Sequence, residues 1–367
     1  MTRRFAFVAM VLAAVTIAAV DAAAQSRPGL TADTQKKLME SLNKAEAYLK
    51  QQQAPDGIWE KHPGITALAA TAILKQPGKS KAAQLPTVAK SLDYLVSLAK
   101  PDGGIYDKAI PHYITAVSAS ALATGGRAQD RPVLLKAGRY LAENMLDEGE
   151  GVNKNEFWYG GMGYGGTTRA DGRRADMISL EYALRAMRDA ELPENDAAWQ
   201  KAIVFLQRTQ NNSETNDQKW AANDGGFVYY PGFTYHTDGG TRSYGSVSYV
   251  GVLSYTWANV KKDDNRVKAI GKWIRDNYTV DENPGTGQKT VYYYYMVFAK
   301  ALQALGDGTI TDSRGRTHAW REELGRKLLE LQHPEGYWVN DKDRAEMQDN
   351  KVLVTAFTMS AIQAILQ

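Results

Sequence analysis

Cysteine is absent from the 367 residues of this chain. Its absence excludes disulfide bonds, thiolate nucleophiles, cysteine-ligated zinc and a lipoprotein anchor. Phenylalanine is scarce as well, with 8 residues against 20 tyrosines. Because a tyrosine ring has a polar edge, this preference predicts many aromatic side chains with one edge in water.

A large excess of either charge is also lacking. Lysine and arginine together number 44, aspartate and glutamate 41, and the net charge is +3. This balance is too even for a nucleic-acid groove or a patch that binds anionic membranes. Hydrophobic residues make up 44% and charged residues 23%, as in ordinary globular proteins. We therefore expect a folded protein that does not bind nucleic acid.

One long apolar stretch stands at the N-terminus. Arg3 and Arg4 precede apolar residues 5–20, and Ala22-Ala23-Ala24 follows as a small-residue cleavage site. This order is typical of a secretory signal peptide, here residues 1–24. The alternative, an uncleaved anchor, is disfavoured because the stretch is short against the ~20 residues of a membrane span. The sequence predicts a secreted or periplasmic protein without stable membrane insertion.

A pair of helices around a glycine-aromatic turn recurs along the rest of the chain. Three of the first helices end near a glutamine, at Gln53, Gln210 and Gln332, and most turns resemble Asp56-Gly57-Ile58-Trp59 or Glu335-Gly336-Tyr337-Trp338. Apolar residues recur at three- and four-residue steps, as in helices. The expected pairs are residues 45–53 with 65–74, 89–98 with 113–123, 133–145 with 177–187, 202–210 with 247–257, 267–278 with 292–305, and 320–332 with 353–366.

Six such pairs predict an all-α fold of stacked units. The second helices contain small residues such as Ala69, Ala70 and Ala119, which allow the close approach that an inner ring requires. Even without residues 1–24, the chain exceeds the ~250–300 residues at which a compact core stops growing. An annular core removes that limit. We therefore expect one domain, residues 30–367, folded as an (α/α)6 toroid of six helix pairs.

The glutamine and aromatic residue of each turn predict a structural staple. Gly57 and Gly336 permit a sharp reversal with positive φ. The aromatic ring can then cover the amide of Gln53 or Gln332. We expect that amide to bond free N–H groups at the start of the next helix. The aromatic residues of these turns are therefore assigned to the scaffold.

These repeats resemble those of the squalene cyclase and protein prenyltransferase superfamily, which have a related Gln…Gly-x-Trp phrase. The resemblance covers residues 40–367 and is closest to exported bacterial "prenyltransferase and squalene oxidase repeat" proteins of unassigned activity. It implies a terpenoid cyclase-like toroid and specifies no reaction. The phrases that suggest it are Gly160-Gly161-Met162-Gly163-Tyr164, Arg242-Ser243-Tyr244-Gly245-Ser246, Asp281-Glu282-Asn283-Pro284-Gly285 and Trp320-Arg321-Glu322-Glu323-Leu324.

The catalytic motifs of the characterised relatives are incomplete here. The cyclases have an Asp-x-Asp-Asp acid box at an inner helix start, where this chain has Arg173-Arg174-Ala175-Asp176. Neighbouring arginines favour an ionised Asp176 over the neutral acid that protonates an alkene. The prenyltransferases bind zinc through Asp, Cys and His, and this chain has no cysteine and no histidine pair at helical ligand spacing. We expect no metal, no cofactor, and neither of these two reactions.

Loops that precede inner helices should meet at one end of the barrel. Two of them, residues 149–175 and 224–244, exceed ordinary connections in length. Together with the tyrosine run at 292–295, their residues predict a ligand-binding mouth. In the alternative interpretation, the tyrosines simply cover the barrel end. The candidate binding residues are Trp158, Tyr164, Arg174, Tyr230, Arg242, Tyr244 and Tyr292.

The candidate catalytic residues are His236, Asp238 and Asp176. Histidine side chains in general titrate near neutral pH, and Asp238 could orient the imidazole of His236, so this pair is a candidate general base. For Asp176, a helix N-cap is the favoured alternative. Glu181 would either face the lumen or bond a neighbouring helix.

Three functions fit these observations. The first is an exported toroid whose cavity binds a small or chain-like, isoprenoid-like ligand, as the resemblance implies. The second is a polysaccharide hydrolase or lyase whose aromatic loops stack a glycan ligand, and the third is a non-catalytic scaffold that docks an exported protein. A deep apolar lumen favours a lipid-like ligand, two carboxylates ~5–10 Å apart favour glycan hydrolysis, and a filled lumen with a flat apolar patch favours docking.

Overall fold

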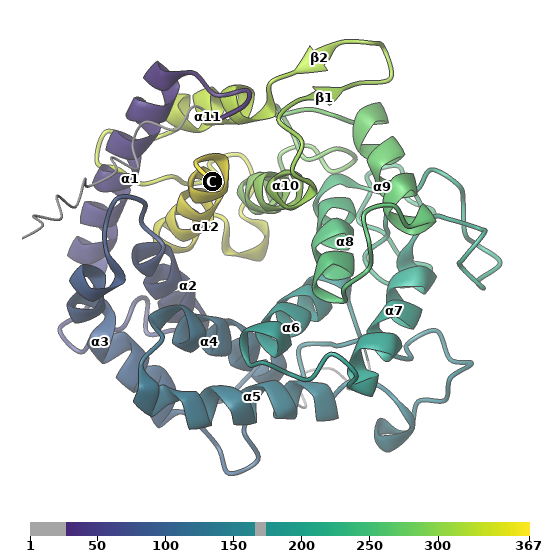
Figure 1. Ribbon diagram of the computed structural model, residues 1–367, viewed down its shortest axis with the longest axis horizontal. Coiled ribbons are helices and arrows are strands. Elements are labelled where there is room, and N and C mark those ends of the chain that lie inside the picture. The colour runs from purple at the N-terminus through teal and green to yellow at the C-terminus, as the bar shows by residue number, and fades with distance from the viewer. Residues whose placement is uncertain (1–26, 166–173) are drawn as a thin grey trace, which may run out of the picture.

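The computed structural model describes residues 27–165 and 174–367, so the expected signal peptide lies outside the described residues. Within them, twelve α-helices form two concentric rings (Figure 1). The inner ring contains α2 (Pro63–Leu74), α4 (Pro111–Gly125), α6 (Met177–Asp189), α8 (Gly245–Trp257), α10 (Val291–Leu305) and α12 (Lys351–Ile365). The outer ring contains α1 (Ala32–Gln52), α3 (Lys81–Ser97), α5 (Arg131–Glu143), α7 (Ala197–Thr209), α9 (Asn265–Asp276) and α11 (Trp320–Glu330).

The inner ring is closed. Each inner helix packs against the next one along the chain, and α12 packs back against α2. Outside it, α1 contacts both α11 and α12, so the first and last helix pairs are joined. The predicted (α/α)6 toroid is confirmed, and every predicted helical segment falls on one of these helices.

Burial distinguishes the two rings. The inner helix α4 is buried on nearly all sides, and its run Ala116–Ala121 consists mostly of small residues that let its neighbours approach closely. The outer helix α9 buries one stripe, Val267, Ile270, Trp273 and Ile274, and exposes most of its charged residues. This difference follows from position, since an inner helix has neighbours on both sides and an outer helix behind it.

The glycine-aromatic turns link one outer helix to the next. The Gln53 amide donates to the carbonyls of Gly57 and Thr87, each at 3.2 Å, and Thr87 belongs to α3. The Gln332 amide likewise donates to Gly336 and, across the ring closure, to Ser41 of α1. The predicted staple exists, but its predicted partners were wrong. The amide satisfies carbonyl groups rather than the free N–H groups of the next helix start.

The turn aromatics complete the same link. The indole of Trp59 donates to the Leu49 carbonyl at 2.7 Å, near the end of α1, and Trp338 does the same to Leu328 of α11. Both indoles are fully buried. Gly57 has φ 86°, and a Cβ there would lie 2.5 Å from the Cβ of Lys90, so the turn needs glycine. These aromatics therefore belong to the scaffold.

Little other regular structure is present in the described ranges. A two-stranded antiparallel hairpin, β1 (Ile310–Thr311) with β2 (Thr317–His318), precedes α11. Three short 3-10 helices cover Ala128–Asp130, Glu148–Glu150 and Ala345–Met347. No described helix combines the length and apolar character that crossing a membrane would need.

Candidate functional site

The starts of the inner helices surround a cavity of about 190 Å³, called the aromatic cavity below. It lies at the barrel end where the predicted loops meet, because all six inner helices begin there. Most of its wall is aromatic or aliphatic. The aromatic members of the lining are His62, Tyr113, Tyr164, Tyr182, Tyr229, Tyr235, Tyr244, Tyr293 and Phe357, and the aliphatic ones include Ile65, Leu68, Ile110, Ile178 and Leu353.

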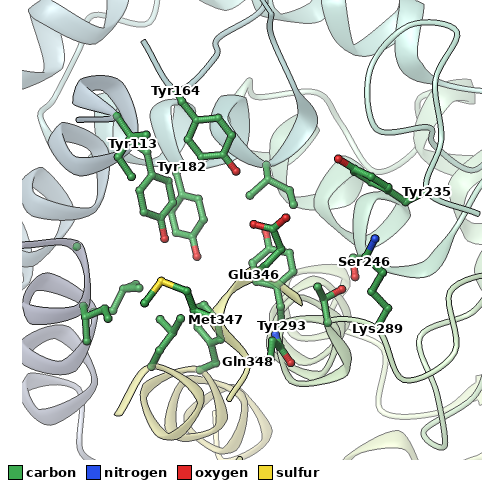
Figure 2. Close-up of a pocket in the computed structure, with 18 of the residues that line it drawn as sticks. Tyr113, Tyr164, Tyr182, Tyr235, Ser246, Lys289, Tyr293, Glu346, Met347 and Gln348 are labelled. Carbon is green, nitrogen blue, oxygen red and sulfur yellow. The ribbon is translucent and has the colours of Figure 1, made fainter. Parts of the chain in front are cut away.

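Tyrosines from several inner helices face this cavity. Tyr113 comes from α4, Tyr182 from α6 and Tyr293 from α10, and Tyr164 lies in the loop before α6 (Figure 2). The rings of Tyr113 and Tyr182 meet edge to face, with centroids 5.2 Å apart. Burial raises the pKa of all four hydroxyls above the ordinary value. At neutral pH these residues are uncharged phenols whose faces suit apolar or cationic groups.

The phenol of Tyr293 in the wall has an unused hydrogen-bonding group. The Tyr293 hydroxyl is buried and has no hydrogen-bond partner among the residues that the structure describes. Buried hydroxyls are normally bonded, because an unmet one costs about 1–3 kcal/mol. A polar group on a bound ligand would meet this need.

Glu346 supplies the carboxylate of the described cavity wall. Its side chain projects into the cavity between Tyr164 and Tyr182 on one side and Tyr235 and Lys289 on the other (Figure 2). No hydrogen bond or ion pair of this carboxylate is found within residues 27–165 and 174–367. Its negative charge stands close to the starts of the inner helices, where the helix dipoles favour an anion.

The backbone that presents Glu346 is in the left-handed region. Glu346 has φ 53° and Met347 has φ 61°, an uncommon conformation for residues other than glycine. The next residue, Gln348, fastens this loop, because its side-chain oxygen accepts the N–H of Tyr292 at 3.2 Å and its carbonyl accepts that of Asn340 at 2.9 Å. Strained residues held in this way are typical of functional sites.

His62 contributes a neutral edge to the wall. Its Nδ1 accepts the N–H groups of Gly64 and Ile65 at 3.1 and 3.3 Å and so caps α2. Burial lowers the pKa of His62, which favours the uncharged imidazole. Among the described lining side chains, formal charge is therefore confined to Glu346 and Lys289. The cavity suits an apolar ligand with a small polar end.

The structure places two of the predicted binding residues in the cavity wall, Tyr164 and Tyr244. Tyr292 is buried in α10 outside the lining, and its neighbour Tyr293 faces the cavity instead. A 3.6-residue turn separates the directions of adjacent side chains by ~100°, and the sequence did not specify the rotation of α10.

Trp158 and Tyr230 lie beside the cavity rather than in its lining. They belong to an aromatic strip, defined as Phe157, Trp158, Tyr230, Phe233 and Tyr235, whose consecutive ring centroids are 4.5–5.2 Å apart. Tyr235 ends the strip and lines the cavity, so the two predicted long loops do meet here. Phe157, at the other end, is 40% exposed.

The two predicted arginines are not part of the lining. Arg174 is exposed, and Arg242 is exposed and paired with Asp238 at 3.1 Å. Asp238 thus directs its carboxylate to Arg242, while the ring of His236 accepts the backbone N–H of Asp238. The general-base role of His236 and Asp238 stays a prediction that this geometry does not favour.

Asp176 is the N-cap of α6. Its Oδ1 accepts the N–H groups of Ile178 and Ser179, and its Oδ2 accepts the Ser179 hydroxyl at 2.8 Å. This is the alternative that the sequence favoured. A catalytic role for Asp176 is untested, and Arg173 of the same motif lies outside the described residues.

Sequence reasoning missed Tyr113, Tyr182 and Glu346, and from the tyrosine run at 292–295 it chose Tyr292 rather than Tyr293. The tyrosines offered a usable signal, since Tyr113 and Tyr293 stand in the first turn of predicted inner helices and Tyr182 in the second. The sequence contained no usable signal for Glu346. Its direction depends on a left-handed backbone conformation, and no glycine or asparagine at this position indicates one.

Comparison with solved structures identifies similar folds. The type II terpene cyclase MstE from Scytonema, in complex with its product merosterolic acid A, gives a TM-score of 0.59 at 15% sequence identity, covering 92% of this chain and 99% of that one. MstE with its substrate geranylgeranyl dihydroxybenzoate gives 0.57 at 13% identity, with the same coverage. A protein from Actinoplanes gives 0.56 at 13% identity over 90% of this chain and 100% of that one.

At these identities the likeness establishes the fold, which is a terpenoid cyclase-like toroid. No protein-family model and no curated protein matches the chain. The narrower resemblance to prenyltransferase and squalene oxidase repeat proteins therefore stays a prediction.

Proposed function

We propose that this terpenoid cyclase-like toroid binds an isoprenoid-like ligand in the aromatic cavity. The observation that carries the proposal is the wall itself, in which tyrosines and aliphatic side chains surround one carboxylate, Glu346. Apolar surface buried in such a cavity contributes ~25 cal/mol per Å². The complexes of the structurally similar MstE, with geranylgeranyl dihydroxybenzoate and merosterolic acid A, support the same ligand class.

In this proposal the ligand's polar end meets Glu346 and the hydroxyl of Tyr293. A ligand hydroxyl would donate to the Glu346 carboxylate, and the Tyr293 hydroxyl would donate to the ligand oxygen. The isoprenoid tail would lie along Leu68, Ile178 and Phe357. The predicted signal peptide places this binding outside the cytoplasm, and export is part of the proposal.

The wall favours this function over the other two. Glycan hydrolysis uses two carboxylates, and Glu346 is the one carboxylate in the described lining. A docking scaffold would have a filled lumen, whereas this lumen holds a cavity of about 190 Å³.

The test is a binding titration with geranylgeraniol, followed by intrinsic fluorescence or native mass spectrometry, with cellotetraose as the competing class. Leu68→Trp fills the cavity, and Leu135→Trp places the same ring on the exposed face of α5 as the matched control. We expect about 30-fold weaker geranylgeraniol binding in the first variant and less than about twofold change in the second. Binding of cellotetraose alone, or equal affinities in the two variants, would overturn the proposal.

A second variant tests the polar end and does not depend on the folding of Leu68→Trp. Glu346→Gln keeps the size of the side chain but removes its charge. We expect it to weaken binding of geranylgeraniol about tenfold and to leave binding of squalene, which has no hydroxyl, unchanged. Equal losses of affinity for geranylgeraniol and squalene would show that Glu346 does not bind the hydroxyl of the ligand.

A further inference from the structure

A second cavity, of about 220 Å³, occupies the opposite end of the barrel, where the inner helices finish. It is called the charged cavity below. Three cationic side chains line it: Lys75 at the end of α2, Arg185 on α6 and Lys300 on α10. Two carboxylates, Glu181 and Asp189 of α6, line it as well. No part of this site takes part in the proposed isoprenoid binding.

Both carboxylates already have partners in the scaffold. Glu181 accepts the indole N–H of Trp257 at 2.9 Å, which ties α6 to α8. Asp189 accepts the Ser120 hydroxyl at 2.7 Å and lies 3.6 Å from the Arg185 Nε. Each of the two carboxylates therefore bonds a side chain of a neighbouring inner helix.

The two lysines have no such partners. In the described part of the chain, neither the Lys75 nor the Lys300 ammonium makes a hydrogen bond or an ion pair. The converging helix ends favour cations here, because each helix dipole is negative at its C-terminus. Cations that serve helix ends bond directly to carbonyls, as Arg188 does to Trp257 and Lys262 to Leu305, at 2.5 and 2.7 Å. The ammonium groups of Lys75 and Lys300 make no such bond to a carbonyl in the described part of the chain.

The electrostatics agree with missing counter-ions. Burial and the nearby Arg185 together lower the pKa of Lys300 to about 7, and the same two causes lower the pKa of the partly exposed Lys75 to about 8. Asp189 raises the pKa of both lysines and Glu181 raises that of Lys300, but these carboxylates do not compensate for the lowering. An added anion between the ammonium groups would supply the missing charge.

We propose that the charged cavity binds a small oxyanion, a carboxylate or phosphate group, between Lys75, Arg185 and Lys300. The Arg185 guanidinium offers a planar pair of N–H donors, and the lysines offer point charges on the other sides. The cavity's volume admits such a group with a short organic part. The site is distinct from the aromatic cavity, since the two share no lining residue.

Calorimetric titration with inorganic phosphate and, separately, with succinate tests this proposal, in a buffer without other oxyanions at about pH 6.5, below the pKa of both lysines. We expect saturable binding of one or both probes. Phosphate binding alone would identify a phosphate site, and succinate binding alone a carboxylate site. Absence of saturable binding for both probes at about 20 mM would overturn the proposal.

Matched variants locate the anion. Lys300→Met and Lys75→Met remove one charge each at similar side-chain length, and Lys272→Met removes an exposed charge on α9. We expect about tenfold weaker binding in the first two and an unchanged affinity in the third. Lys75 is partly exposed at the end of α2, so we expect Lys75→Met to fold and to test the site even if Lys300→Met does not fold. Equal affinity in all three variants and the unaltered protein would place the anion elsewhere.

Discussion

The two ends of this barrel are built from the same six helices and offer opposite chemistry. At the helix starts, uncharged tyrosines and aliphatic side chains enclose one free carboxylate, Glu346. At the helix ends, lysine, arginine, glutamate and aspartate enclose a cavity of similar volume. At the N-terminal ends the helix dipoles favour the Glu346 carboxylate, which shares the described lining with one cation, Lys289. At the C-terminal ends the dipoles favour cations, and three cationic side chains outnumber two carboxylates there. A closed ring of parallel inner helices thus supplies two separate sites.

The largest expected effect tests that separation. Leu68→Trp should weaken geranylgeraniol binding about 30-fold and change phosphate affinity less than about twofold, because it fills the aromatic cavity alone. Lys300→Met should do the reverse, with about tenfold weaker phosphate binding. Calorimetric titration of both ligands against both variants gives the four affinities. If one variant weakens both ligands, the lumen is a single site and the comparison fails.

The next largest effect is expected in the stability at alkaline pH, which should differ between the charged and the aromatic ends of the barrel. Lys300 has a folded-state pKa of about 7 against an ordinary 10.5, so between these values the unfolded chain binds a proton that the folded protein does not. The free energy of unfolding therefore gains up to about 1.4 kcal/mol per pH unit over this range from Lys300. Urea denaturation at several pH values should show a flatter rise in Lys300→Met than in the unaltered protein.

At the aromatic end, the free energy of unfolding should change with pH in the opposite direction. Burial raises the pKa of Tyr293, so above the ordinary value of 10.0 the unfolded chain loses a proton first and stability falls. Tyr293→Phe, which keeps the ring, should lessen that fall in stability. It should leave unchanged the rise in stability that Lys300 causes at lower pH. An identical pH profile for Lys300→Met and the unaltered protein would show that folding does not lower the pKa of Lys300.

A smaller effect concerns the scaffold at the aromatic end. Asp176→Ala removes the N-cap of α6 and the partner of the buried Ser179 hydroxyl, and should cost about 1–2 kcal/mol of unfolding free energy. Asp176→Asn, which keeps the cap acceptor, should cost less. Geranylgeraniol affinity should hold in both, because Asp176 is not in the lining. A large loss of binding without loss of stability would assign Asp176 to the site.

The smallest effect is expected at the rim. Arg242 and Asp238 form an ion pair in which both side chains are more than half exposed. Arg242→Ala should change stability by less than about 0.5 kcal/mol and leave geranylgeraniol binding unaltered. Thermal denaturation and the same titration measure both quantities. A tenfold loss of geranylgeraniol affinity would show that Arg242 contributes to ligand binding, as the sequence predicts.

The site was predictable in part. The long loops before α6 and α8 indicated the correct end of the barrel, and Tyr164 and Tyr244 stand in the cavity wall. Trp158 and Tyr230 contribute to the strip beside it. The tyrosine run in α10 was recognised, but choosing Tyr292 over Tyr293 required the rotation of the helix, which packing decides.

The charged cavity was less accessible to sequence reasoning. Glu181 was expected to face the lumen or a neighbouring helix, and it does both, since it lines this cavity and bonds Trp257. Lys75, Arg185 and Lys300 come from three different helices, and each of them is more than a hundred residues from the next in the sequence. Only closure of the ring brings such residues together.

The sequence by itself determined the helix pairs, the glycine turns and, through them, the closed toroid, because these depend on local periodicity and on residues a few positions apart. Tertiary structure alone decided which side of each inner helix faces the axis and where Glu346 points. It also decided that the turn glutamines bond carbonyls of the next outer helix. The physical reason is that these features depend on how separate helices rotate and pack against one another, and the residues of a single segment do not specify that.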